Sequence, residues 1–76
     1  MFGFGKSKTA KQLDEILKSL QLAFENNYKD NARANLKKFE SAYEEAKAGG
    51  KLRDKEVAQY GNMLLELKER LKNFHH

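Results

Sequence analysis

The chain has 76 residues, of which 39% are hydrophobic and 34% are charged, with a formal net charge of +4 and no cysteine or proline. This length allows one small domain, and the missing cysteines exclude disulfides and thiolate metal sites. No apolar run approaches the roughly 20 residues that cross a bilayer, and the first residues lack the apolar core of a secretory signal. We therefore expect a cytoplasmic protein.

Residues 1–8 are predicted to form a flexible basic arm, because two glycines interrupt any periodic pattern. Three lysines and no acidic residue occur among the first eleven residues, interleaved at the start with phenylalanines. This combination suits an anionic membrane surface or a nucleic-acid backbone. The candidate contacts are Phe2, Phe4, Lys6, Lys8 and Lys11. At the other end, we interpret residues 75–76, two histidines, as the remnant of a purification tag.

The first helix is predicted over residues 9–26. Thr9 followed by Gln12 has the spacing of a capping box, so Thr9 is the expected N-cap, with Ser7 as the alternative. Apolar residues then recur every three or four positions, which keeps them on one side of a helix. This stripe consists of Ala10, Leu13, Leu17, Leu20 and Phe24. Asn26 and Asn27 are expected to end the helix, because asparagine tolerates the left-handed conformation of a C-cap.

The second helix is predicted over residues 30–48, with Asp30 as its N-cap. Its apolar stripe has the same three–four spacing and consists of Ala32, Leu36, Phe39, Tyr43 and Ala46. Gly49 and Gly50 are the clearest stop signal in the chain, since glycine takes positive φ without steric cost.

The third helix is predicted over residues 54–74, with Asp54 as its N-cap. Its stripe consists of Val57, Tyr60, Leu64, Leu67, Leu71 and Phe74. Gly61 lies beside this stripe, roughly level with Tyr43. It is expected to make room for an aromatic ring or a close helix approach, and a hinge is the alternative.

These stripes predict an all-α protein, an antiparallel up-down-up three-helix bundle over residues 9–74. Neighbouring helices are expected to be antiparallel because both connections are short. Matching the stripes places Leu17, Phe39 and Leu64 in one central layer and Phe74 near Tyr28 at one end. A monomer is expected, because the aromatic-rich stripes suit a globular core. A dimer that exchanges helices is the alternative, since the same spacing describes coiled coils.

No catalytic, cofactor or metal site is expected, because the chain has no cysteine and no histidine before residue 75. Gly5, Lys6 and Ser7 match only the end of a phosphate-binding loop, without its first glycine or preceding strand. We therefore expect no enzyme, but a protein–protein interaction or structural module with an unknown protein partner. Leu22 and Leu65 lie off the stripes and are the candidate partner surface. The alternative function is binding of nucleic acid or lipid through the basic arm.

Overall fold

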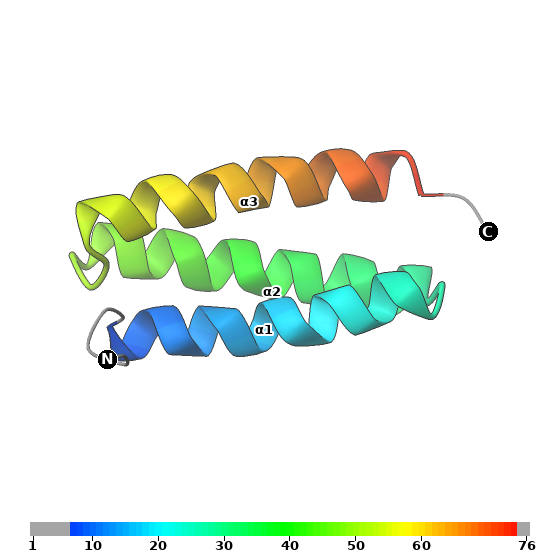
Figure 1. Cartoon of the computed structure of the whole chain (residues 1–76), viewed down its shortest axis with the longest axis horizontal. Helices are drawn as coiled ribbons and strands as arrows, with labels where there is room; N and C mark the ends of the chain where they lie inside the picture. Colours follow the sequence, from blue (N-terminus) through cyan, green and yellow to red (C-terminus); the bar gives the residue numbers. More distant parts are fainter. Residues whose placement is uncertain (1–6, 75–76) are drawn as a thin grey trace.

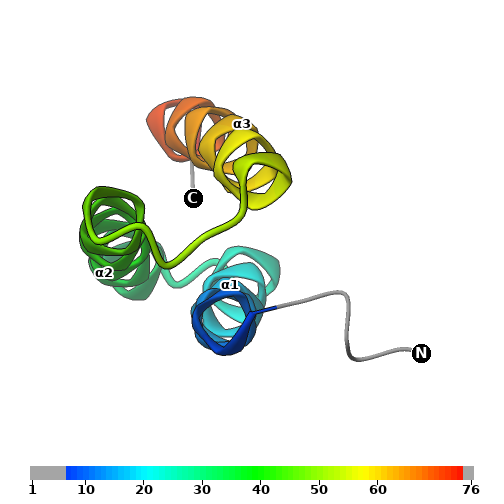
Figure 2. The same ribbon diagram turned by 90° about the vertical axis from the view of Figure 1, so that its left-hand side faces the viewer.

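The computed structural model describes residues 7–74, which form three α-helices and no strand. The helices are α1 (Lys8–Glu25), α2 (Lys29–Ala48) and α3 (Asp54–Lys72). They lie side by side along the long axis of the molecule (Figure 1), and viewed from the end they occupy the corners of a triangle (Figure 2). The prediction of an all-α fold is confirmed for these residues. None of the three helices is long and apolar enough to cross a membrane.

The N-cap of α1 is Ser7, so the prediction of Thr9 is wrong and the alternative is right. The Ser7 Oγ accepts a hydrogen bond from the backbone N–H of Ala10 at 3.1 Å, which satisfies one of the free donors at the helix start. Ser7 also contacts Glu56 of α3. Glu56 is 49 positions from Ser7 in the sequence, so the local spacing around Thr9 does not reveal this contact.

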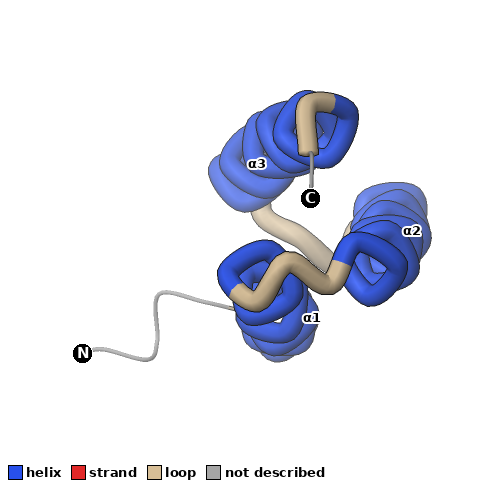
Figure 3. The backbone as a smooth tube through the Cα atoms, turned by 90° about the vertical axis from the view of Figure 1, so that its right-hand side faces the viewer, coloured by secondary structure: helices blue, strands red, loops and turns tan. Residues whose placement is uncertain are grey.

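The connections between the helices are short (Figure 3). The helix bounds agree with the predicted 9–26, 30–48 and 54–74 to within one residue, except that α3 ends at Lys72, two residues earlier than predicted. Asn27 has a φ of 59°, the left-handed conformation expected after α1. Gly49 is the C-cap of α2, and Gly50 follows with a φ of 67°. Asn26 and Asn27 therefore end α1, and Gly49 and Gly50 end α2.

The N-caps of α2 and α3 differ from the predicted aspartates. Tyr28 occupies the N-cap position of α2, without a side-chain capping hydrogen bond, and Arg53 occupies that of α3. Asp30 and Asp54 lie in the first turns. In the first turn a carboxylate is still favoured by the positive end of the helix dipole. At α3 the carboxylate of Glu56 accepts the backbone N–H of Arg53 at 3.0 Å.

The core contains every predicted stripe residue of α1 and α2. On α3 the outcome is different, because only Tyr60 and Leu64 of the stripe are buried. The other four stripe residues are partly buried against the core: Val57, Leu67, Leu71 and Phe74. The apolar side of α3 is therefore covered less completely than the apolar sides of α1 and α2.

Aromatic rings fill the middle and one end of the core. Phe39 is fully buried, with its ring centroid 6.5 Å from that of Tyr43 and 6.3 Å from that of Tyr60. At the end, the ring of Phe74 packs on Phe24 at 5.3 Å. Tyr28, which we expected beside Phe74, is 58% exposed.

Gly61 makes room for an aromatic side chain, as predicted. A Cβ at Gly61 would lie 2.7 Å from the hydroxyl oxygen of Tyr43, closer than such atoms approach in proteins. That hydroxyl donates a hydrogen bond to the carbonyl of Val57 at 2.8 Å. The glycine thus lets Tyr43 reach the backbone of α3.

Three buried residues were absent from the predicted stripes. Ala23 adds to the core from α1, and Leu52 adds to it from the connection between α2 and α3. Glu56 is a buried charged residue, only 6% exposed. Burial of a carboxylate requires hydrogen-bond partners, and these lie in the site described next.

Candidate functional site

A polar bridge connects the beginnings of α1 and α3. One carboxylate oxygen of Glu56 accepts the backbone N–H of Ser7 at 3.2 Å. The other accepts the Ser7 hydroxyl at 3.1 Å and the backbone N–H of Arg53 at 3.0 Å. Glu56 therefore completes the start of α3 and attaches α1 to it.

These hydrogen bonds decide the charge state of Glu56. Burial raises the pKa of the carboxyl group, but the hydrogen bonds from Arg53 and Ser7 favour the ionised form and outweigh it. The net pKa lies below the ordinary value of 4.5. The one sequence signal for this role is the position of Glu56 three residues after the cap, as in a capping box.

A second bridge joins the same two helices one turn further along. The hydroxyl of Tyr60 donates a hydrogen bond to Asp14 Oδ1 at 2.6 Å and lies 3.4 Å from the carbonyl oxygen of Ala10. Burial, together with the hydrogen bond to Asp14, raises the pKa of Tyr60 well above its ordinary value of 10.0. Tyr60 is therefore neutral at physiological pH and acts as a hydrogen-bond donor in a structural contact.

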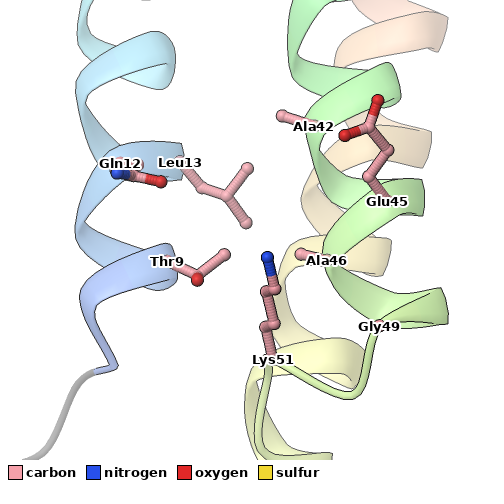
Figure 4. Close-up of a pocket in the computed structure, with 8 residues that line it drawn as sticks. All are labelled: Thr9, Gln12, Leu13, Ala42, Glu45, Ala46, Gly49 and Lys51. Atoms are coloured by element: carbon pink, nitrogen blue, oxygen red, sulfur yellow. The ribbon is translucent and has the colours of Figure 1, made fainter.

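A small pocket of about 250 Å³ lies between the first half of α1 and the end of α2. It is lined by Thr9, Gln12, Leu13, Ala42, Glu45, Ala46, Gly49 and Lys51. In Figure 4 the side chain of Lys51 extends between the two helices, beside Ala46. Its aliphatic part covers apolar surface while the ammonium stays accessible. One lysine and one glutamate line this pocket, which gives it no clear preference for either sign of charge.

A shallow groove of about 280 Å³ runs between α1 and α3, and we call it the α1–α3 groove. Leu17 and Gln21 line it from α1, and Met63, Glu66, Leu67 and Arg70 line it from α3. Met63 and Leu67 are partly buried against the core, so an apolar strip stays accessible between the two helices. Its volume lies near the lower end of the roughly 300–1,000 Å³ of most small-molecule sites.

The arm residues predicted to contact an anionic surface divide into two groups. Phe2, Phe4 and Lys6 lie outside the described residues. Lys8 and Lys11 are exposed on the first turns of α1. Their ammonium groups are therefore accessible to an anionic partner.

The two leucines predicted as a partner surface are both exposed, Leu22 by 54% and Leu65 by 66%. Leu65 lies one turn before Lys68, whose Nζ is 2.6 Å from the carboxylate of Glu40 on α2. Leu65 belongs to α3, whereas Leu22 belongs to α1. Whether they share a partner stays a prediction.

Within residues 7–74, no group of three or more side chains is arranged to hold a metal ion. Glu56 is buried and Asp14 and Glu40 are partly buried, and each of these three carboxylates accepts a hydrogen bond from the protein itself. Comparisons with models of protein families, with curated proteins and with solved structures find no match to this chain.

Proposed function

We propose that this protein is a small, non-catalytic interaction module that binds a partner protein through the α1–α3 groove. We further propose that it is an antiparallel, up-down-up three-helix bundle that acts as a monomer in the cytoplasm.

Three contacts support the proposed course of the chain. Ser7 at the beginning of α1 contacts Glu56 near the beginning of α3. Phe24 near the end of α1 packs on Phe74, just beyond the end of α3. These two contacts favour α1 and α3 pointing the same way. Tyr43 late in α2 bonds the carbonyl of Val57 early in α3, which favours α2 running in the opposite direction.

The observation that carries the proposed function is the incomplete cover of the apolar side of α3. The stripe of α2 is fully buried, whereas Leu67 and its neighbours Met63 and Leu71 are only partly buried. Accessible apolar residues rimmed by polar ones are typical of surfaces that bind other proteins. A partner that covered this strip would remove apolar surface from water.

The chemistry of the side chains supports a non-catalytic role. The chain has no cysteine, and its two histidines are the last two residues. General acid–base and nucleophilic catalysis most often use those residue types. The carboxylates of Glu56 and Asp14 are engaged in contacts between helices, which favours a structural role for both.

The proposal can be tested by pull-down from an extract of the source cells, with the whole chain as bait. Leu67→Gln should release a bound partner, because it puts a polar group into the groove. Leu65→Gln is the matched control, since it makes the same change on an exposed position of the same helix. Circular dichroism should first establish that both variants fold. A partner lost with Leu67→Gln and retained with Leu65→Gln supports the groove.

The same experiment separates the other surfaces. A partner that is lost with Leu22→Ser or Leu65→Ser, and retained with Leu67→Gln, binds the outer leucines and contradicts the groove. Light scattering measures the molar mass of the purified protein in solution. A mass of twice that of one chain would contradict the proposed monomer.

Binding to an anionic polymer or membrane is the second candidate function, because Lys8 and Lys11 are exposed beside the basic first residues. Such binding should weaken steeply with salt. It should also disappear when residues 1–6 are deleted and Lys8 and Lys11 are changed to serine. Groove binding should survive both changes.

A further inference from the structure

We propose that residues 65–74, the last part of α3 and the two residues after it, form a lid that opens as one unit while the rest of the bundle stays folded. Its opening uncovers the buried ring of Phe24. We call these residues the α3 lid. The motion belongs to the free protein, whether or not a partner binds in the α1–α3 groove.

The two parts of α3 are anchored very differently. All three buried residues of the helix, Glu56, Tyr60 and Leu64, lie in the first part, and none of residues 65–74 is buried. In α1 and α2 the buried residues continue to Phe24 and Ala46, close to the helix ends. Fully burying one large apolar side chain favours the folded form roughly ten- to a hundredfold. The α3 lid lacks such an anchor.

The polar contacts between helices show the same division. In the first part of α3, Glu56 and Tyr60 are hydrogen-bonded to the beginning of α1, and the carbonyl of Val57 accepts a hydrogen bond from α2. The α3 lid contributes the ion pair of Lys68 with Glu40, whose side chains are 46% and 39% exposed. Ion pairs this accessible to water stabilise little. The lid is therefore held less firmly than the part of the helix before it.

The α3 lid covers one aromatic ring. The ring centroid of Phe74 lies 5.3 Å from that of Phe24, and the guanidinium carbon of Arg70 lies 4.4 Å from the Phe24 centroid, a cation–π contact. Phe24 is 5% exposed, whereas Phe74 is only partly buried and Arg70 is exposed. Because both contacts end on the same ring, they are lost together. Few buried contacts and accessible polar ones are typical of segments that open locally.

Native-state amide hydrogen exchange of the whole chain, followed by NMR at low urea concentrations, measures this opening. After correction for intrinsic rates, the amides of residues 67–71 should exchange at least roughly tenfold faster than those of residues 60–64, because the lid has no buried apolar anchor. They should share one urea dependence, smaller than that of global unfolding, since less surface becomes exposed. The amides of residues 20–24, at the well-buried end of α1, are the internal control and should exchange slowly.

Substitutions separate opening of the lid from unfolding of the bundle. Tyr60→Phe removes a hydrogen bond that stays formed when the lid opens. It should speed exchange of residues 60–64 roughly two- to tenfold, the effect of one hydrogen bond, and leave residues 67–71 unchanged. Phe74→Ala should speed exchange of residues 67–71 at least roughly twofold, as expected for loss of an aromatic pair. Leu65→Ala is the matched control, because it shortens an exposed side chain of the lid and should alter neither group.

Two results would overturn the proposal. If residues 60–64 and 67–71 exchange with the same free energy and urea dependence, and Tyr60→Phe speeds both equally, the whole of α3 unfolds only with the bundle. If the rates of residues 67–71 instead rise steadily toward the end of the helix without a urea dependence, this end frays residue by residue and does not open as a unit. Circular dichroism should first establish that each variant is folded.

Discussion

Replacing Gly61 with alanine tests the packing between α2 and α3 most directly. In an ordinary helix interior, alanine is more stable than glycine by about 1 kcal/mol. Here the new Cβ would lie 2.7 Å from the hydroxyl oxygen of Tyr43. The Tyr43 side chain is 5% exposed and bonded to the carbonyl of Val57, so it has little freedom to move aside. We therefore expect Gly61→Ala to destabilise the protein.

The size of the effect follows from opposing contributions. Loss of the Tyr43–Val57 hydrogen bond costs about 0.5–1.5 kcal/mol, and overpacking costs about 1–3 kcal/mol. After the gain in helix propensity is subtracted, the free energy of unfolding should fall by about 0.5–3.5 kcal/mol. If Tyr43 is first changed to phenylalanine, the nearest remaining atom is the ring Cζ at 3.5 Å, an ordinary contact. In that background the same substitution should stabilise by up to about 1 kcal/mol.

Urea unfolding followed by circular dichroism can measure this change of sign. The four proteins form a double-mutant cycle, and the coupling energy should be at least about 1.5 kcal/mol. If Gly61→Ala stabilises both backgrounds, or if the two substitutions are additive, the close contact between Gly61 and Tyr43 is refuted.

Four further predictions concern the bridges and the missed core residue. The lowered pKa of Glu56 means that its ionised form stabilises the fold above pH 4.5 and that this stability is lost as pH falls through the lower folded value. Glu56→Gln should therefore lower the free energy of unfolding by about 1–3 kcal/mol at neutral pH, and urea titrations should show this difference shrinking in acid. Tyr60→Phe removes the hydrogen bond to Asp14 and should cost about 1 kcal/mol by chemical denaturation; a gain would contradict the bridge. In the wild type, ultraviolet titration should find one tyrosine that ionises only well above pH 10. Leu52→Ala should cost about 2 kcal/mol, near the lower end for a buried leucine, and an unchanged melting temperature would show that Leu52 lies outside the core.

The sequence pattern predicted the three helices because their apolar spacing and stop signals are local properties. Phe39 and Leu64 are buried as their positions on the stripes require. The helix starts were less predictable, since an N-cap can be chosen by a partner distant in sequence. Ser7 is such a case, because its hydroxyl contacts Glu56 as well as the first turn of α1.

The candidate site was less predictable than the fold. Periodicity identifies an apolar side of a helix, but it does not say how completely the neighbouring helices cover that side. Leu67 was therefore expected in the core, and its partial exposure depends on how α1 and α3 are spaced. Arg70 is a charged residue, so the apolar periodicity did not single it out. Its contact with Phe24 joins two helices, and local spacing does not reveal such a contact. The exposure of Leu22 and Leu65 was predictable, because both positions lie away from the apolar stripes of their helices.

The hydrogen bonds between Ser7 and Glu56 join residues that are 49 positions apart. During synthesis, the first turn of α1 leaves the ribosome long before the residue that holds it. A nascent chain that ends after α2 therefore lacks this anchor, and its amino-terminal turn should fray until α3 emerges. The appearance of α3 thus determines when the first turn of α1 becomes fixed.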